Sequence, residues 1–80
     1  MTLIATFYSH FGAVRFARAL KERGLPARMA PVPRDLSSSC GTCVRYEDPA
    51  PAESGYGEEV EQVAEVLEGG YRILYRAEDS

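Results

Sequence analysis

The chain has 80 residues, of which 45% are hydrophobic, and its length fits one small domain with a thin core. No apolar run approaches the roughly 20 residues of a membrane-spanning helix. The net charge of −3 is unevenly distributed: residues 1–46 carry seven Lys or Arg and two Asp or Glu, whereas residues 47–80 carry two and ten. Because no basic surface dominates, general nucleic-acid binding is disfavoured.

The first residues predict a buried strand followed by a helix. Thr2–Tyr8 (TLIATFY) is rich in apolar and β-forming residues, and Ser9 then offers a favourable helix N-cap. Gly24 fits the position just past a helix end, and Pro26 cannot continue a helix. Between these points the apolar residues recur at the helical i, i+3, i+4, i+7 spacing, at Ala13, Phe16, Ala17 and Leu20.

Two further strands are predicted in the middle of the chain. Ala27–Val32 is the first of them, and Pro31 and Pro33 cannot donate hydrogen bonds to a neighbouring strand. This strand should therefore lie at a sheet edge. Thr42–Glu47 is the next strand, and residues 48–57 (DPAPAESGYG) have the composition of a surface linker.

The last third of the chain predicts a second helix and a final strand. Gly69 and Gly70 are expected to end the helix, Tyr71–Arg76 alternates like a strand, and residues 77–80 form a tail. The helix is predicted from the helical spacing of four apolar residues: Val60, Val63, Ala64 and Leu67.

This order, β-α-β-β-α-β, predicts a single α+β domain over residues 1–80 with a ferredoxin-like fold. The expected architecture is a four-stranded antiparallel sheet in the order 4-1-3-2, with two helices on one face. In that topology the first and third strands are neighbours. The helix start at Ser9 should therefore lie beside the loop that carries Cys40.

Both cysteines lie in one short stretch, PRDLSSSCGTC, which ends in a Cys-x-x-Cys motif. The sequence start lacks the features of a secretory signal, so we expect a cytoplasmic protein with reduced thiols. A redox pair is one interpretation. If Cys40 and Cys43 were both extended, however, their Cα atoms would lie about 10 Å apart, and a disulfide needs less than about 7 Å. A redox pair therefore requires a turn at Gly41 and Thr42.

Metal binding is a second interpretation of the motif. A closed zinc site needs four ligands, and the chain offers Cys40, Cys43 and one histidine, His10. A monomer thus falls short unless a carboxylate or water joins, and we expect no metal.

A single working thiol at Cys40 is the third interpretation. A helix N-terminus carries partial positive charge and free N–H groups, both of which favour a thiolate. His10 could share a proton with the thiol, and Gly41 permits a close backbone approach or a positive φ. The auxiliary residues are expected to be Cys43, His10, Ser9, Arg34, Ser38, Ser39 and Gly41. The hydroxyls of Ser37, Ser38 and Ser39 can donate hydrogen bonds to an anion. The alternative is a plain turn, with Cys40 as a small buried apolar residue in a non-catalytic interaction module.

Several separated motifs resemble the selenium/sulfur (Se/S) carrier protein-like family over roughly the first 46 residues. The family pattern is a strand ending in Phe-x-Ser-His/Thr, a helix, a Gly-hydrophobic-Pro turn, then Pro-x-Pro-Arg and Ser-Ser-Cys-Gly. The matching residues are Phe7, Ser9 and His10; Gly24, Leu25 and Pro26; Pro31, Pro33 and Arg34; and Ser38, Ser39, Cys40 and Gly41.

The resemblance implies that Cys40 carries sulfur or selenium as a persulfide or selenosulfide, with Cys43 as an auxiliary residue. Donor and acceptor proteins would be the partners, and no cofactor would be needed. Because thin cores gain from association, we also expect a homodimer.

Overall fold

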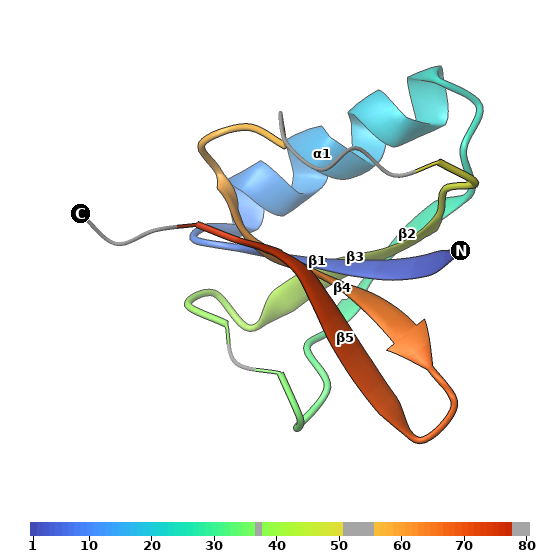
Figure 1. Cartoon of the computed structure of the whole chain (residues 1–80). Helices are drawn as coiled ribbons and strands as arrows, with labels where there is room; N and C mark the ends of the chain where they lie inside the picture. The colour runs from blue at the N-terminus through green and yellow to red at the C-terminus, as the bar shows by residue number, and fades with distance from the viewer. Residues whose placement is uncertain (37, 51–55, 78–80) are drawn as a thin grey trace.

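The computed structural model describes residues 1–36, 38–50 and 56–77. Five antiparallel strands form one sheet in the order β2-β3-β1-β4-β5, and one helix covers a face of it (Figure 1). The elements are β1 (Thr2–Phe7), α1 (His10–Glu22), β2 (Ala27–Pro31), β3 (Thr42–Glu47), β4 (Val60–Leu67) and β5 (Gly70–Arg76).

The first half of the chain follows the expected element order. Ser9 caps α1, since its side-chain oxygen accepts a hydrogen bond from the Gly12 amide at 3.1 Å. β2, which ends at Pro31, lies at an edge of the sheet, as the sequence predicts, and β3 lies between β2 and β1. The neighbouring placement of the first and third strands therefore agrees with the structure.

The predicted ferredoxin-like fold with two helices and four strands is wrong, because residues 60–67 form β4 and not a helix. β4 is an inner strand that is buried on both faces, so its apolar residues do not alternate simply. A bulge also interrupts its pairing with β1: Thr6 pairs with Gln62 and Phe7 with Val60, which leaves Glu61 unpaired. Burial on both faces together with a bulge produced the apparent helical spacing.

The expected strand order fails at the same point. The last strand, β5, pairs with β4, so β4 and not the last strand lies beside β1. The two glycines expected to end a helix instead belong to a hairpin: Leu67 pairs with Gly70, and Gly69 lies in the turn with φ +82°. The fold is α+β and consists mostly of sheet.

The main core lies between α1 and the sheet. Alternate residues of β1, Leu3, Ala5 and Phe7, pack there with apolar residues of the helix. Phe16 of α1 joins two strands, because its ring lies 5.2 Å from that of Phe7 and 5.4 Å from that of Tyr46, centroid to centroid.

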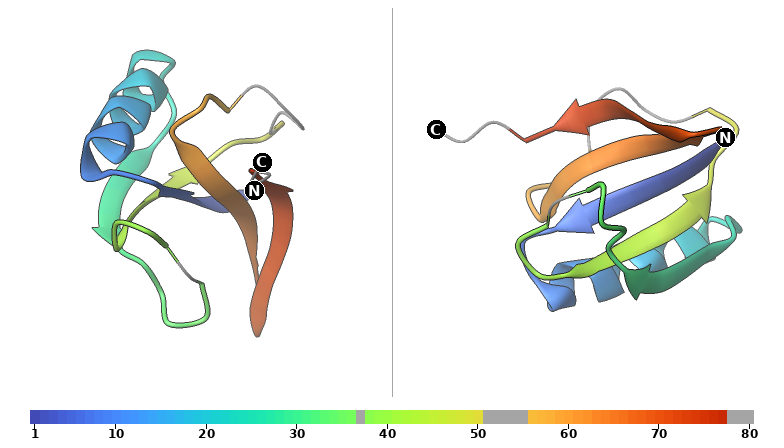
Figure 2. Two further views of the ribbon diagram at one scale, coloured as in Figure 1. Left: turned by 90° about the vertical axis from the view of Figure 1, so that its left-hand side faces the viewer. Right: turned by 90° about the horizontal axis from the view of Figure 1, so that it is seen from below.

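The opposite face of the sheet is also covered. Ile4, Thr6 and Cys43 are buried there, although they lie outside the main core. Residues 32–36 and 38–41 lie on this side, away from α1, in both Figure 1 and Figure 2. The segment that carries Cys40 therefore packs against the sheet.

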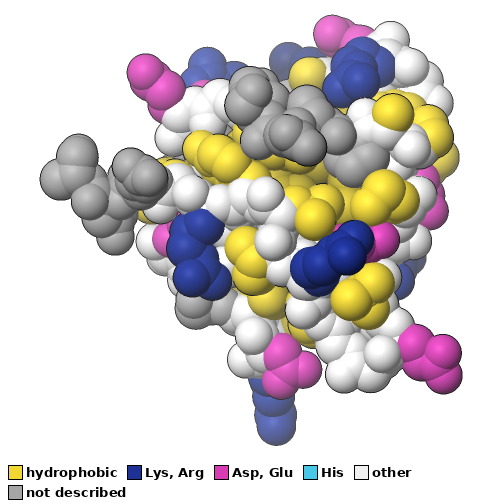
Figure 3. Space-filling view, in the orientation of Figure 1, with side chains coloured by type: hydrophobic (Ala, Val, Ile, Leu, Met, Phe, Trp, Pro, Cys, Tyr) yellow, Lys and Arg dark blue, Asp and Glu magenta, His cyan; other side chains and the backbone are white. Residues whose placement is uncertain are grey.

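Part of the surface remains apolar. Figure 3 shows hydrophobic side chains gathered between α1 and β5 on the face seen in Figure 1.

No helix in the described part of the chain is long and apolar enough to span a bilayer. The expected linker and tail fall partly on residues 51–55 and 78–80, which lie outside the described residues.

The β4–β5 hairpin makes the first testable prediction. Gly69 has a positive φ and Gly70 does not, and a Cβ at either position would meet open space. Gly69→Ala should therefore lower the free energy of unfolding by about 1–2 kcal/mol, the cost of a left-handed backbone for an L-residue. Gly70→Ala, the matched control, should change it by less than about 0.5 kcal/mol. Equal losses in urea unfolding would contradict the turn assignment.

Candidate functional site

The pairing of β1 with β3 brings the cysteine loop to the start of the helix. The strands are antiparallel with Thr6 opposite Cys43, so the end of β1 lies beside the beginning of β3. Two contacts join the loop to the β1–α1 junction. The Ser38 hydroxyl donates to the Phe7 carbonyl at 3.4 Å, and His10 Nδ1 lies 3.4 Å from Thr42 Oγ1.

Backbone hydrogen bonds shape the loop between β2 and β3. The Val32 amide donates to the Gly41 carbonyl at 3.2 Å, which closes the loop where it leaves β2 and enters β3. A turn follows β2, in which the Leu36 amide donates to the Pro33 carbonyl at 3.0 Å. Gly41 has φ +74°, a conformation that favours glycine, and its bend directs the chain from Cys40 into β3.

The Cys40 thiol is free and half-buried at the end of this loop. Its sulfur lies 4.0 Å from the Ser38 hydroxyl oxygen and donates to the Thr42 carbonyl at 3.4 Å. The Cys40 amide also donates to Ser38 Oγ at 3.4 Å. One serine side chain therefore contacts the Cys40 amide, the Cys40 sulfur and the carbonyl at the end of β1.

Cys43 lies in a different environment, three residues further along. Its side chain is 1% exposed inside β3, and its sulfur donates to the Pro31 carbonyl at 3.6 Å. Burial raises the pKa of the Cys43 thiol; the Arg45 charge opposes this, and the nearby Cys40 adds to it. Cys43 is therefore a protonated thiol held within the sheet.

The Glu61 carboxylate anchors the loop to the sheet, a contact that the sequence did not predict. It accepts the Ser39 amide at 3.1 Å and the Ser39 hydroxyl at 2.6 Å, and the Thr6 hydroxyl donates to it at 3.3 Å. Glu61 is the unpaired bulge residue of β4, and such bulges redirect side chains. Because Glu61 fell within a predicted helix, nothing in the sequence pattern indicated this role.

The remaining predicted auxiliary residues divide into two groups. Ser9 and His10 lie beside the loop, but the Ser9 hydroxyl is engaged in capping α1, and the His10 ring contacts Thr42. Arg34 is exposed in the turn after β2, and no contact joins it to Cys40 among the described residues. Ser37 lies outside the described residues.

The described part of the chain contains no group of three His, Cys, Asp or Glu side chains that could hold a metal ion. Cys40, Cys43 and His10 therefore do not gather into a ligand set. What the loop presents is a single half-buried thiol with a hydroxyl beside it.

Comparison with curated proteins shows a similarity to a bacterial protein. The chain is 33% identical over 57 residues to "Uncharacterized protein YtiA" of Escherichia coli (strain K12), across 71% of this chain. The aligned part spans 60% of the length of that relative. No solved structure matches this chain.

Comparison with protein families matches a somewhat larger part of the chain. A family model described as "Putative Se/S carrier protein-like" matches residues 2–70, which include the whole cysteine loop and most of the sheet. The resemblance seen in the first 46 residues thus extends through β4. The chain belongs to the Se/S carrier protein-like family.

Proposed function

We propose that this protein carries sulfur or selenium on Cys40 as a persulfide or selenosulfide. The observation that supports the proposal best is the contrast between the two thiols. Cys40 is half-buried in a loop and contacts a hydroxyl, whereas Cys43 is fully buried within β3. The family description, which names a Se/S carrier, is consistent with this role.

The loading step is a redox-neutral transfer between thiols. The Cys40 thiolate attacks the outer sulfur of a donor persulfide, R–S–SH. A new S–S bond forms on Cys40 as the donor S–S bond breaks, and its electron pair leaves with the donor thiolate, R–S⁻. The products are the Cys40 persulfide and a donor thiol, so neither an external oxidant nor a cofactor is needed. Transfer to an acceptor thiol reverses the step.

Groups near Cys40 suit an anionic terminal sulfur. The Ser38 hydroxyl can turn from the Phe7 carbonyl towards the sulfur, which lies 4.0 Å away. The N-terminus of α1, with its partial positive charge, lies next to the loop at the His10–Thr42 contact. The donor and acceptor would be proteins that reach this end of the sheet, and a homodimer of the carrier stays a prediction.

A thiol redox pair is less compatible with these contacts. A Cys40–Cys43 disulfide would require the Cys43 sulfur to leave the Pro31 carbonyl and its buried position in β3. Burial also raises the pKa of Cys43, which disfavours the thiolate that such exchange needs.

Incubation with a small persulfide donor, followed by intact-protein mass spectrometry, tests the proposal. We expect one added sulfur on the wild-type protein and on Cys43→Ser, and none on Cys40→Ser, because only the loop thiol is accessible. Modification that persists in Cys40→Ser would contradict carriage at Cys40. A rapid decrease in the mass of the wild-type protein by two hydrogens would indicate a Cys40–Cys43 disulfide and support the redox alternative.

The Glu61 anchor makes a separate prediction about the loop. Glu61→Gln removes the charge that accepts the Ser39 amide, so hydrogen exchange at that amide should accelerate about tenfold. Glu65→Gln is the matched control, because Glu65 lies on the same strand and pairs with Arg72. If both substitutions leave the Ser39 amide equally protected, Glu61 does not anchor the loop.

A further inference from the structure

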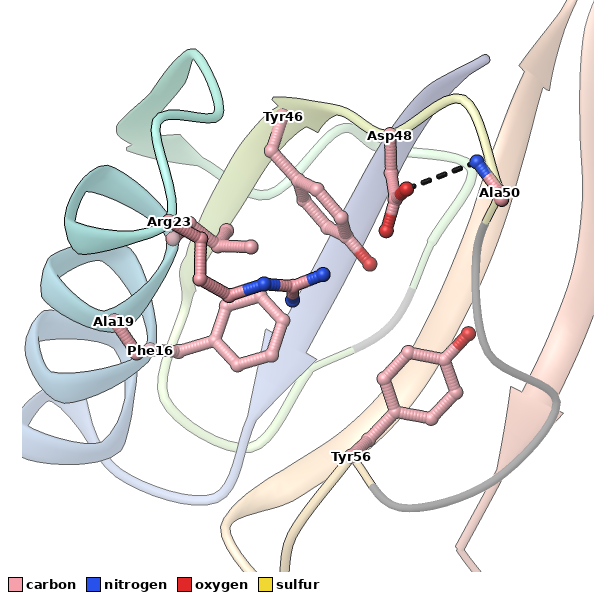
Figure 4. A pocket seen from close by; sticks show the side chains of 8 residues that line it. Phe16, Ala19, Arg23, Tyr46, Asp48, Ala50 and Tyr56 are labelled. Atoms are coloured by element: carbon pink, nitrogen blue, oxygen red, sulfur yellow. Dashed lines mark hydrogen bonds between the residues drawn. The ribbon is translucent and has the colours of Figure 1, made fainter.

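A cavity of about 270 Å³ lies at the other end of β3, between the C-terminal half of α1 and the residues that follow β3 (Figure 4). This cavity lies far from the cysteine loop. Thr42 begins β3 and Asp48 follows its end, so the two sites are separated by about six extended residues, or roughly 20 Å. The residues that carry the argument are Phe16, Leu20, Arg23, Tyr46, Asp48 and Tyr56.

A tyrosine hydroxyl is directed into this cavity. Tyr46 is only 2% exposed, and its hydroxyl points into the hollow in Figure 4. That hydroxyl forms no hydrogen bond with residues 1–36, 38–50 or 56–77. Burial raises the pKa of Tyr46; the nearby Tyr56 and Asp48 add to the effect, and the Arg23 charge opposes it. The phenol is therefore a neutral hydrogen-bond donor that faces the open space of the cavity, where a ligand could accept from it.

Two opposite charges line the same cavity without pairing. Asp48 is 8% exposed and accepts a hydrogen bond from the Ala50 amide at 3.0 Å, but no cation pairs with it within the described part of the chain. The Arg23 guanidinium extends towards the cavity from the end of α1 (Figure 4) and likewise forms no ion pair with a described residue. A buried carboxylate is costly without a compensating positive charge, and a ligand could supply one.

We propose that this cavity binds a small zwitterion, an α-amino acid with an apolar side chain. Its carboxylate would lie between Arg23 and the Tyr46 hydroxyl, and its ammonium group would contact Asp48. Phe16 and Leu20 provide an apolar wall for the side chain. The volume lies just below the range of about 300–1,000 Å³ typical of ligand pockets, which favours a small ligand over a large cofactor.

Nuclear magnetic resonance titration of the full chain with L-alanine, L-leucine and L-phenylalanine tests this site. At least one of these amino acids should produce saturable changes in the amide chemical shifts of Leu20, Arg23 and Asp48. The amide chemical shift of Cys40 should not change. N-acetyl-L-leucine lacks the ammonium group and L-leucinamide lacks the carboxylate. Each should bind about tenfold more weakly than L-leucine, since each loses one charge-assisted contact. The proposal is overturned if no amino acid gives saturable shift changes, or if L-leucine and both derivatives bind with equal affinity.

Substitutions distinguish binding in this cavity from a general effect of surface charge. Arg23→Gln and Asp48→Asn should each weaken amino-acid binding about tenfold, and Tyr46→Phe should weaken it several-fold while keeping the ring that packs on Phe16. Arg18→Gln is the control, because Arg18 is exposed on the same helix outside this cavity. Equal effects of Arg18→Gln and Arg23→Gln would contradict the proposal. Persulfide loading of Cys40 should be unchanged in all four variants, so the two proposals fail independently.

Discussion

The antiparallel pairing of β1 with β3 is the constraint on which the thiol site depends. Its register, with Thr6 opposite Cys43, fixes Cys43 in a buried row of the sheet and leaves Cys40 just before the strand. The same pairing holds the loop against the β1–α1 junction. Because β1 also pairs with β4 on its other side, Glu61 can reach Ser39 from the neighbouring strand. The sheet therefore determines the different environments of two cysteines only three residues apart.

The sequence was informative where local patterns and a topology rule agreed. Ser9 caps the helix, β2 with its Pro31 lies at an edge of the sheet, and Gly41 has the positive φ that its place in the loop suggested. The neighbouring position of the helix start and the cysteine loop followed from pairing the first and third strands. The family motifs pointed to the same residues, and the family model, which matches residues 2–70, confirms the family.

The remainder could not be predicted because it depends on non-local pairing. β4 is buried on both faces and bulged at Glu61, so its apolar residues match a helical period as well as a strand. That error hid the role of Glu61, whose side chain reaches Ser39, 22 residues away in the sequence. The contacts of His10 with Thr42 and of Tyr46 with its cavity likewise depend on tertiary packing.

The proposed contrast in reactivity between Cys40 in the loop and Cys43 within the sheet is tested most directly by alkylation under native conditions. The rate should be measured on Cys43→Ser, which leaves Cys40, and on Cys40→Ser, which leaves Cys43. We predict that Cys40 reacts about a hundredfold faster, because Cys43 becomes accessible only when β3 opens. Similar rates for the two thiols in folded protein would contradict the assignment of Cys40 as the carrier residue.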